Sequence, residues 1–590
     1  MPPPDPPSAS SPAAGPSASR LAPARHEDAL RQGGGRGWSV AALLVAGLVL
    51  MPVLSVLWLA MNPTNNIWPH LMSTVMPRYF GNTVMLALGT GLLAAAMGTG
   101  AAWLVSMHDF PGRGALQWLL LLPLAVPAYI GAYALADFLD YSGPVQTALR
   151  AWFGWESARD YWFPRIRSLE AAIVVLAAAL YPYVYLLTRA ALNEQSGSAY
   201  EVARALGTGP WGLFRRVGLP LARPAIVAGS AIAMMEAVAD YGVVSYFGVQ
   251  TLNTGIFTTW LERRNAGGAA QIAVAMLGII VVLALWERIS RRNARYHQSA
   301  RQPRPIQRSR LSGWRAWGAT LACLMPFAMG FVLPVGVILS YALAYPQGWL
   351  TPGLGRAAWN TVWLGGTAAV VTVLLAMVMV HGTRLSGRRL PRLLMPVTTI
   401  GYAAPGAVLA VGLLIPLAAL DHRVADALLA LTGSDPGLLL TGSGAAIILA
   451  YVVRFFAIGQ GAIDAAFTRV PPSLPMAARS LGRDNAGVLR VVYLPMMRGS
   501  VGAALLLIFV DSVKELPATL LLRPFNFETL ATRTHERASL EDLGNAAPAA
   551  LLVMLVGLAA VALLARTNLG GAQGRLHPRA GRGNESGSPA

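Results

Sequence analysis

The sequence predicts an all-α polytopic membrane protein with about 12 transmembrane helices, arranged as two parallel six-helix repeats. Three observations predict this class: the composition, the number of long apolar runs, and a polar segment that occurs twice. Of the 590 residues, 55% are hydrophobic and only 12% are charged, and the mean hydropathy is +0.50. Such a chain has too little polar surface to cover a soluble globule of this size, so lipid must solvate it.

The apolar residues fall into continuous runs that are long enough to cross a bilayer. A spanning helix needs about 20 largely apolar residues. The runs are continuous rather than alternating, which excludes a closed β-barrel. The chain contains twelve such runs, centred near residues 49, 93, 126, 180, 235, 278, 329, 370, 406, 455, 510 and 556.

Arginine placement predicts the orientation of these spans. If the N-terminus is cytoplasmic, the inner segments hold 30 arginines and the outer loops hold 12. An excess of positive charge in short loops marks the cytoplasmic side. We therefore expect both termini in the cytoplasm, and we interpret the net charge of +19 as a sign of topology rather than of nucleic-acid binding.

One polar segment between apolar runs recurs 275 residues later in the chain. Residues 201–220 read EVARALGTGPWGLFRRVGLP, and residues 476–495 read MAARSLGRDNAGVLRVVYLP. The pattern predicts a short helix, a glycine turn with positive φ, and a second helix that starts at Leu-Pro. The positions that define this pattern are Glu201, Ala203, Gly207, Leu219 and Pro220 in the first copy and Ala478, Gly482, Leu494 and Pro495 in the second.

Other paired elements extend the repeat across both halves of the chain. Asn82-Thr83-Val84 matches Asn360-Thr361-Val362, and Pro127 and Pro405 interrupt corresponding spans. Six spans separate each element from its copy, so both halves keep the same orientation. The predicted organisation is a disordered cytoplasmic tail (1–37), a first membrane domain (38–288), a basic cytoplasmic linker (289–315), a second membrane domain (316–566) and a disordered C-terminal tail (567–590).

The duplicated segment resembles the EAA motif of binding-protein-dependent ABC importer permeases. The first copy departs from that motif at Val202, where alanine is expected, and the second has Met476 where glutamate is expected. The resemblance implies that each loop docks on one of two cytoplasmic ABC ATPase subunits, which bind and hydrolyse ATP. It also implies a bacterial inner-membrane location. The bland alternative is that the loops only connect helices and look alike because the gene was duplicated.

Longer stretches resemble the fused permeases of ferric-iron transport. They include LLPLAVPAYIGAY (121–133), YVVRFFA (451–457) and DSVKELPATLLLRPFNFETLATR (511–533). This resemblance implies ferric iron as the substrate and a periplasmic or lipid-anchored iron-binding protein as a partner. Permeases for thiamine or phosphonate have a similar architecture and stay open as alternatives. An ion-coupled secondary transporter is a further alternative, although such a transporter has no use for the duplicated loop.

The residues of common catalytic and cofactor sites are missing from the sequence. The only lysine, Lys514, follows Val513 and not a glycine-rich phosphate loop, so the chain lacks a Walker A motif. The string GTGPWG (207–212) fits a dinucleotide fingerprint, but it follows no predicted strand. The single cysteine, Cys323, excludes an internal disulfide. We predict a transport subunit that is not an enzyme and binds no cofactor or established metal, with ATP on its partner.

Charged residues inside the predicted spans are the candidates for a translocation path or gate. A charge at mid-bilayer costs about 2.5 to 3.5 kcal/mol on translocon scales and must face protein or water. Asp511, Lys514 and Glu515 are spaced to share one helix face. Carboxylates and Tyr241 suit a hard ferric ion, whereas an interhelical lock made by the basic residues is an equally good interpretation. The six candidates are Glu236, Asp240, Arg454, Asp511, Lys514 and Glu515.

Overall fold

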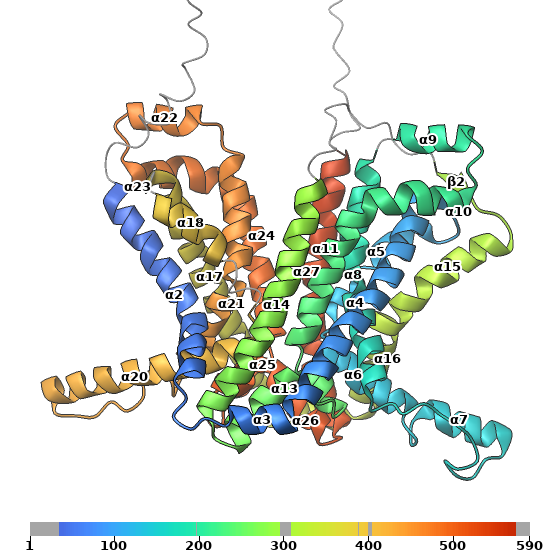
Figure 1. The fold of residues 1–590 in the computed structure, drawn as a ribbon, viewed down its shortest axis with the longest axis horizontal. Coiled ribbons are helices and arrows are strands. Elements are labelled where there is room, and N and C mark those ends of the chain that lie inside the picture. The colour runs from blue at the N-terminus through green and yellow to red at the C-terminus, as the bar shows by residue number, and fades with distance from the viewer. Residues whose placement is uncertain (1–34, 196, 295–307, 387–388, 399–403, 574–590) are drawn as a thin grey trace, which may run out of the picture.

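The computed structural model describes residues 35–195, 197–294, 308–386, 389–398 and 404–573. Most of these residues are helical, which confirms the predicted all-α class (Figure 1). Within the described ranges the only strands are β1 (His108–Asp109) and β2 (Ser309–Arg310), which pair in parallel. Most of both predicted tails and the middle of the predicted linker lie outside the described residues.

The first half of the chain runs from α2 to α14. Its helices are α2 (Gly35–Met61), α3 (Trp68–Thr74), α4 (Met76–Met107), α5 (Arg113–Leu119), η1 (Leu122–Ala125), α6 (Ala128–Leu139), α7 (Pro144–Phe153), α8 (Leu169–Glu194), α9 (Gly197–Ala205), α10 (Pro210–Leu213), η2 (Phe214–Gly218), α11 (Leu219–Ala239), α12 (Gly242–Tyr246), α13 (Leu252–Phe257), η3 (Thr258–Glu262) and α14 (Ala266–Ala294).

The second half follows the same order from α15 to α27. Its helices are α15 (Trp314–Phe327), η5 (Ala328–Val332), α16 (Leu333–Ala344), η6 (Pro346–Leu350), α17 (Leu354–Ser386), α18 (Arg389–Thr398), α20 (Gly406–Thr432), α21 (Gly444–Thr468), α22 (Ser473–Ser480), α23 (Asn485–Val488), η7 (Leu489–Tyr493), α24 (Leu494–Val513), α25 (Pro517–Leu522), α26 (Leu530–Ser539) and α27 (Leu543–Gln573).

Eleven described helices are long and apolar enough to cross a membrane, and one bent pair makes a twelfth crossing if it counts as a single span. The pair joins Arg113–Ala125 to Ala128–Phe153 at an angle of 96°. Pro127 lies at this break with an extended backbone, as the sequence predicts, because proline fixes φ and has no N–H to continue a helix.

The predicted interruption at Pro405 is confirmed, but the centre predicted for this span, near residue 406, is wrong. Pro405 precedes the first residue of α20, so the long helix begins at Gly406 and runs to Thr432 instead of being centred on the proline. The reason is again the missing N–H of proline, which places Pro405 at the N-cap rather than in a helix interior. Residues 399–403 lie outside the described part of the chain.

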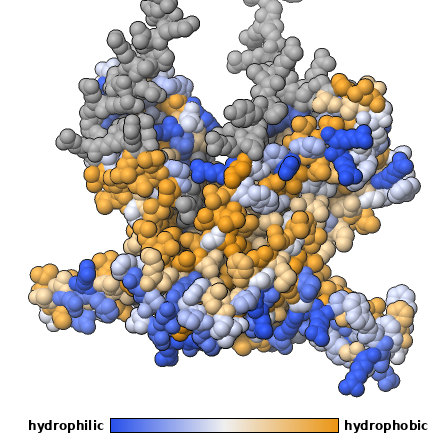
Figure 2. Space-filling model, viewed as in Figure 1, coloured by the Kyte–Doolittle hydropathy of each residue, from blue (hydrophilic) through white to orange (hydrophobic). Residues whose placement is uncertain are grey.

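On the face seen in Figure 2, a hydrophobic belt crosses the molecule between two more polar ends, as expected for a protein solvated by lipid. The segments α9 and α22 lie at one end, and α3, α7 and α26 lie at the other (Figure 1). Helix α2 starts, and helix α27 ends, toward the side of the molecule that carries α9 and α22 (Figure 1). Both copies of the repeated segment therefore face the same side of the predicted membrane.

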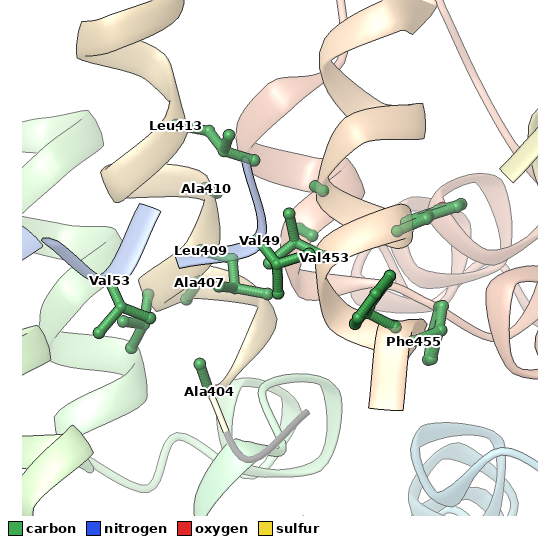
Figure 3. Packing of buried hydrophobic residues seen from close by; sticks show 14 of the residues in the cluster. Val49, Val53, Ala404, Ala407, Leu409, Ala410, Leu413, Val453 and Phe455 are labelled. Atoms are coloured by element: carbon green, nitrogen blue, oxygen red, sulfur yellow. The ribbon is translucent and has the colours of Figure 1, made fainter. Parts of the chain in front are cut away.

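The two halves exchange their first helices. In the first half, α2 packs against α17, α20 and α21 of the second half, and Val49 and Val53 contact a buried apolar cluster with Leu409 and Val453 (Figure 3). In the second half, α15 and α16 pack against α4, α5, α6 and α8 of the first. Burial of these apolar faces joins both halves into one body.

Matched hydrogen bonds recur in the two halves with a spacing of 278 residues. Asn82 donates to the Gln250 carbonyl oxygen (2.8 Å), and Asn360 donates in the same way to Glu528 (2.9 Å). The hydroxyl of Thr83 accepts from the Leu252 backbone N–H (2.9 Å), as Thr361 does from Leu530 (2.8 Å). The Asn-Thr pairs recognised in the sequence therefore fasten the second membrane-spanning helix of each half, α4 or α17, to the start of a short helix, α13 or α26.

The chain between the halves is attached to the first half by the two strands. The Leu311 backbone N–H donates to the Asp109 carbonyl oxygen (3.0 Å), and His108 Nδ1 lies 2.7 Å from the hydroxyl of Ser309. These contacts lie at the end of the molecule that carries α9. The last described residues of the linker thus pack on the loop that follows α4.

Candidate functional site

All six charged candidates line one cavity at the centre of the molecule. The cavity has a volume of about 180 Å³ and is bordered by both halves of the chain. Two acids come from the last turns of helices α11 and α24, and the other two come from the residues just after these helices. The arginine comes from α21. The charged side chains in its wall are Glu236, Asp240, Arg454, Asp511, Lys514 and Glu515.

The prediction that the acids share one face of a continuous helix is wrong in one respect. Both helices that carry them, α11 and α24, end before the last acid of the set. Helix α11 ends at Ala239 and α24 ends at Val513, so Asp240 and Glu515 lie beyond the helices. Asp240 accepts a hydrogen bond from the Val243 backbone N–H (2.9 Å), and Glu515 accepts one from Ala518 (3.2 Å). Each acid therefore caps the start of the next short helix, which explains why the chain breaks there.

Arg454 and Glu515 form an ion pair in the cavity wall. Arg454 Nε lies 3.0 Å from Glu515 Oε2, and the carboxylate-bearing side chain is only 4% exposed. Gly406 makes this approach possible, since a Cβ there would lie 2.3 Å from Glu515 Oε1 and 3.0 Å from Arg454 Nη1. Sequence reasoning missed Gly406, although its position directly after Pro405 marks a helix start.

Lys514 connects the two halves. Its ammonium group donates to the carbonyl oxygen of Leu124 in η1 of the first half (2.6 Å). The predicted lock paired Lys514 with Asp511 or Glu515, whereas the structure records a backbone carbonyl as its hydrogen-bond partner. The carbonyl is available because η1 stops before Pro127, and carbonyl groups at a helix end lack intrahelical donors.

Two of the acids keep their carboxylates free toward the cavity. Among the described residues, neither Glu236 nor Asp511 forms a hydrogen bond or an ion pair with another side chain or the backbone. The cavity therefore holds one internally paired acid, one backbone-capping acid and two unpaired acids. The ion pair is what a lock requires, and the two unpaired acids are what a path requires, so both roles stay predictions for this site.

A buried aromatic group lies beside the cavity on the outer side. The hydroxyl of Tyr133 lies 2.6 Å from His535 Nδ1, and the ring of Tyr241 lies 5.8 Å from the His535 ring. Burial is the main cause that lowers the pKa of His535 to about 4, and the positive charge of Arg523 contributes to the same shift. His535 is therefore neutral at pH 7 in the folded protein.

Acidification is expected to destabilise the protein through His535. The pKa is about 4 in the folded state and about 6.5 in an unfolded chain, so the unfolded state binds the additional proton between these values. The stabilisation is complete above pH 6.5 and decreases as the pH falls toward 4, by roughly 3 kcal/mol in total. Thermal unfolding of wild type and His535→Asn from pH 8 to 4.5 tests this, and equal pH slopes for both proteins would contradict it.

The two repeated loops have the same backbone geometry. Gly207 has a φ of 77° and Gly482 a φ of 82°, as predicted. In the first loop the N–H of Gly207 bonds to Arg204 O (2.9 Å) and that of Thr208 to Ala203 O (3.0 Å). The second loop repeats both bonds from Gly482 and the next residue to Arg479 and Ala478. This pair of bonds defines the glycine-terminated helix end of the Schellman motif.

The segment after each turn differs slightly from the prediction. Helices α11 and α24 begin at Leu219 and Leu494, but the membrane-crossing helices already begin at Pro210 and Asn485. A π-helical turn, η2 or η7, comes directly before each Leu-Pro pair. Since Pro220 and Pro495 have no N–H to donate, the wider turn accommodates them within a continuous helix.

Each loop also exposes an apolar side chain next to its glycine. Leu206 is 80% exposed and Leu481 is 82% exposed, and Trp211 is 70% exposed in the first loop. Leu206 directly follows α9 and Leu481 directly follows α22, and these two helices lie at the same end of the molecule (Figure 1). The two equivalent turns therefore present the same exposed apolar side chain at one end of the molecule.

The comparisons with known proteins agree with this architecture. Residues 87–296 match the family model of the binding-protein-dependent transport system inner membrane component. The Fe(3+)-transport system permease protein FbpB 2 of Haemophilus influenzae is 25% identical over 499 residues, which cover 81% of this chain and 88% of that protein. This match spans both halves.

Two shorter relatives match over part of this chain. The molybdenum transport system permease protein ModB of Escherichia coli is 28% identical over 225 residues, 36% of this chain and 95% of that protein. The Probable sulfate transport system permease protein cysT of Nephroselmis olivacea is 30% identical over 211 residues, 34% of this chain and 70% of that protein. Together with two halves that share their loops and cavity-lining acids, these matches show that the chain belongs to the ABC-type family of binding-protein-dependent transport system inner membrane components.

Proposed function

We propose that this chain is the fused permease of an ATP-driven ABC importer that moves ferric iron across the bacterial inner membrane. Residues 38–288 and 316–566 form its two membrane domains, which arose by internal duplication. Two copies of a cytoplasmic ATPase bind the loops around Gly207 and Gly482, and a periplasmic or lipid-anchored iron-binding protein delivers the ion on the opposite side. Both termini lie in the cytoplasm. This chain binds no cofactor.

The charge of the central cavity is the observation that favours a cation as the substrate. Four carboxylates and two cationic side chains line it, so the wall has a formal excess of negative charge. A cavity of one sign concentrates ions of the opposite sign and repels those of its own sign. A ferric ion, which prefers oxygen ligands as other hard cations do, suits this wall better than sulfate does.

The similarity to an Fe(3+)-transport system permease over both halves supports the same choice. The molybdenum and sulfate transport relatives match about a third of the chain and favour the general permease function without favouring one substrate. The paired loops with their exposed leucines support ATPase docking, which an ion-coupled secondary transporter does not require.

Substrate uptake in cells tests the proposal. In a strain that lacks this gene, we expect ATP-dependent uptake of radiolabelled ferric iron to fall to background and to return with the intact gene. Uptake of labelled sulfate, molybdate, thiamine and phosphonate, measured in the same cells, should stay unchanged. Loss of one of these instead of iron would overturn the substrate but keep the permease function, whereas uptake driven by an ion gradient without ATP would overturn the importer itself.

A further inference from the structure

The hydroxyl of Tyr129 is a buried polar group without a hydrogen-bond partner in the described part of the chain. The side chain is 4% exposed and belongs to the wall of the central cavity. An unpaired buried hydroxyl costs about 1 to 3 kcal/mol. Phenylalanine at this position would fill the same space without that cost. The stability of the fold therefore does not explain why the residue is a tyrosine.

Tyr129 shares the cavity wall with acids from both halves. Asp240 of the first half and Glu515 of the second line the same cavity. A Cβ on Gly242 would lie 2.5 Å from the Tyr129 Cβ, so the backbone after Asp240 packs directly on the tyrosine. The buried ring therefore has little freedom to turn away from the cavity wall.

We propose that Tyr129 contacts the cation in transit and supplies a phenol oxygen beside the carboxylates of Asp240 and Glu236. The inference rests on the proposed ferric-iron function and deepens it, because oxygen donors suit a hard trivalent ion and tyrosine is a known protein ligand of iron. When the iron–oxygen bond forms, the phenol releases its proton to cavity water. When the ion leaves, water returns the proton.

The site is suited to passage rather than to storage. In the described chain no group of three or more His, Cys, Asp or Glu side chains is placed to hold one metal ion. A transported ion must bind well enough to enter and weakly enough to leave. Two carboxylates and one phenol on different segments of the cavity wall meet both conditions.

The test compares Tyr129→Phe with Tyr181→Phe in the intact transporter. Tyr181 is a matched control, because its hydroxyl is also buried without a partner in the described chain, yet it lies outside the cavity wall. We expect Tyr129→Phe to lower the rate of ferric-iron uptake about tenfold or more, as loss of a metal-contacting group does, at an equal or higher melting temperature. Tyr181→Phe should transport iron like wild type.

A spectroscopic measurement separates contact from packing. The purified full-length chain in lipid nanodiscs, mixed with ferric nitrilotriacetate, should develop the visible absorption band of an iron–phenolate bond. Tyr129→Phe should lose this band and Tyr181→Phe should keep it. Wild-type uptake and an unchanged band in Tyr129→Phe would overturn the assignment while iron import stands, whereas absence of iron uptake by wild type would overturn the proposed function itself.

Discussion

Replacing Arg454 with methionine is expected to cost about 3 to 5 kcal/mol of stability, because it leaves a buried carboxylate without its ionic partner. Arg454 Nε lies 3.0 Å from Glu515 Oε2, and the Glu515 side chain is 4% exposed. Removal of one charge from such a pair is costly, whereas removal of both is often nearly neutral. We therefore expect the double variant Arg454→Met/Glu515→Gln to recover most of the loss, since glutamine keeps an oxygen for the Ala518 N–H.

Thermal unfolding of the purified variants measures this effect. Arg384→Met is the matched control, because its ion pair with Asp464 has a similar distance of 2.7 Å but both side chains are about 40% exposed. An exposed pair contributes only about 0 to 1 kcal/mol. A melting temperature of Arg454→Met equal to that of Arg384→Met would show that the buried pair does not act as a lock.

The same double variant also separates the two roles proposed for the cavity. If the ion pair only holds the helices together, the double variant should import iron at the wild-type rate once its stability has recovered. If Glu515 belongs to the path, the double variant should be stable and assembled but slow in transport. Neutralisation of Glu236, which has no ion pair among the described residues, should slow transport without a loss of stability.

The convergence of the charged residues could be predicted from the sequence, but their local geometry could not. Spacing along the chain and the 275-residue offset placed Glu236 and Asp511 on equivalent helices, and the cavity confirms that these helices meet. The ends of α11 and α24 depend on whether a side chain caps the next helix. The helix-breaking residues Gly242 and Pro517 lie just beyond those ends and are the signals that could have revealed them.

Contacts between segments that are far apart in the chain could not be predicted from the sequence. The Lys514 ammonium group binds a carbonyl oxygen 390 residues away, and no periodicity specifies a backbone partner. A glycine is needed at position 406 because the Arg454–Glu515 ion pair leaves no room for a Cβ there. Tyr129 stands out among the residues with a buried, unpaired hydroxyl because it lines the central cavity. The positive φ of Gly207 and Gly482 was predictable, because a helix end with glycine is a local pattern.

Replacing Gly207 or Gly482 with valine is expected to uncouple the permease from its ATPase. Both glycines have a positive φ of 77° or 82°, and a residue with a Cβ costs about 1 to 2 kcal/mol in this conformation. The turn would then open and move the adjacent Leu206 or Leu481. Each leucine that leaves its partner surface forfeits about 1.5 to 3 kcal/mol, which corresponds to a tenfold or greater loss of affinity.

Gly209→Ala is the matched control in the first loop, because Gly209 has an ordinary φ of −68° and open space around its missing Cβ. We expect the valine variants to fold in the membrane but to lose ATPase during purification and to lose ATP-driven uptake, whereas Gly209→Ala keeps both. Gly207→Val should have the larger effect, since the first loop retains Glu201 and the second has Met476 at that position. Normal co-purification and uptake in both valine variants would show that the loops only connect helices.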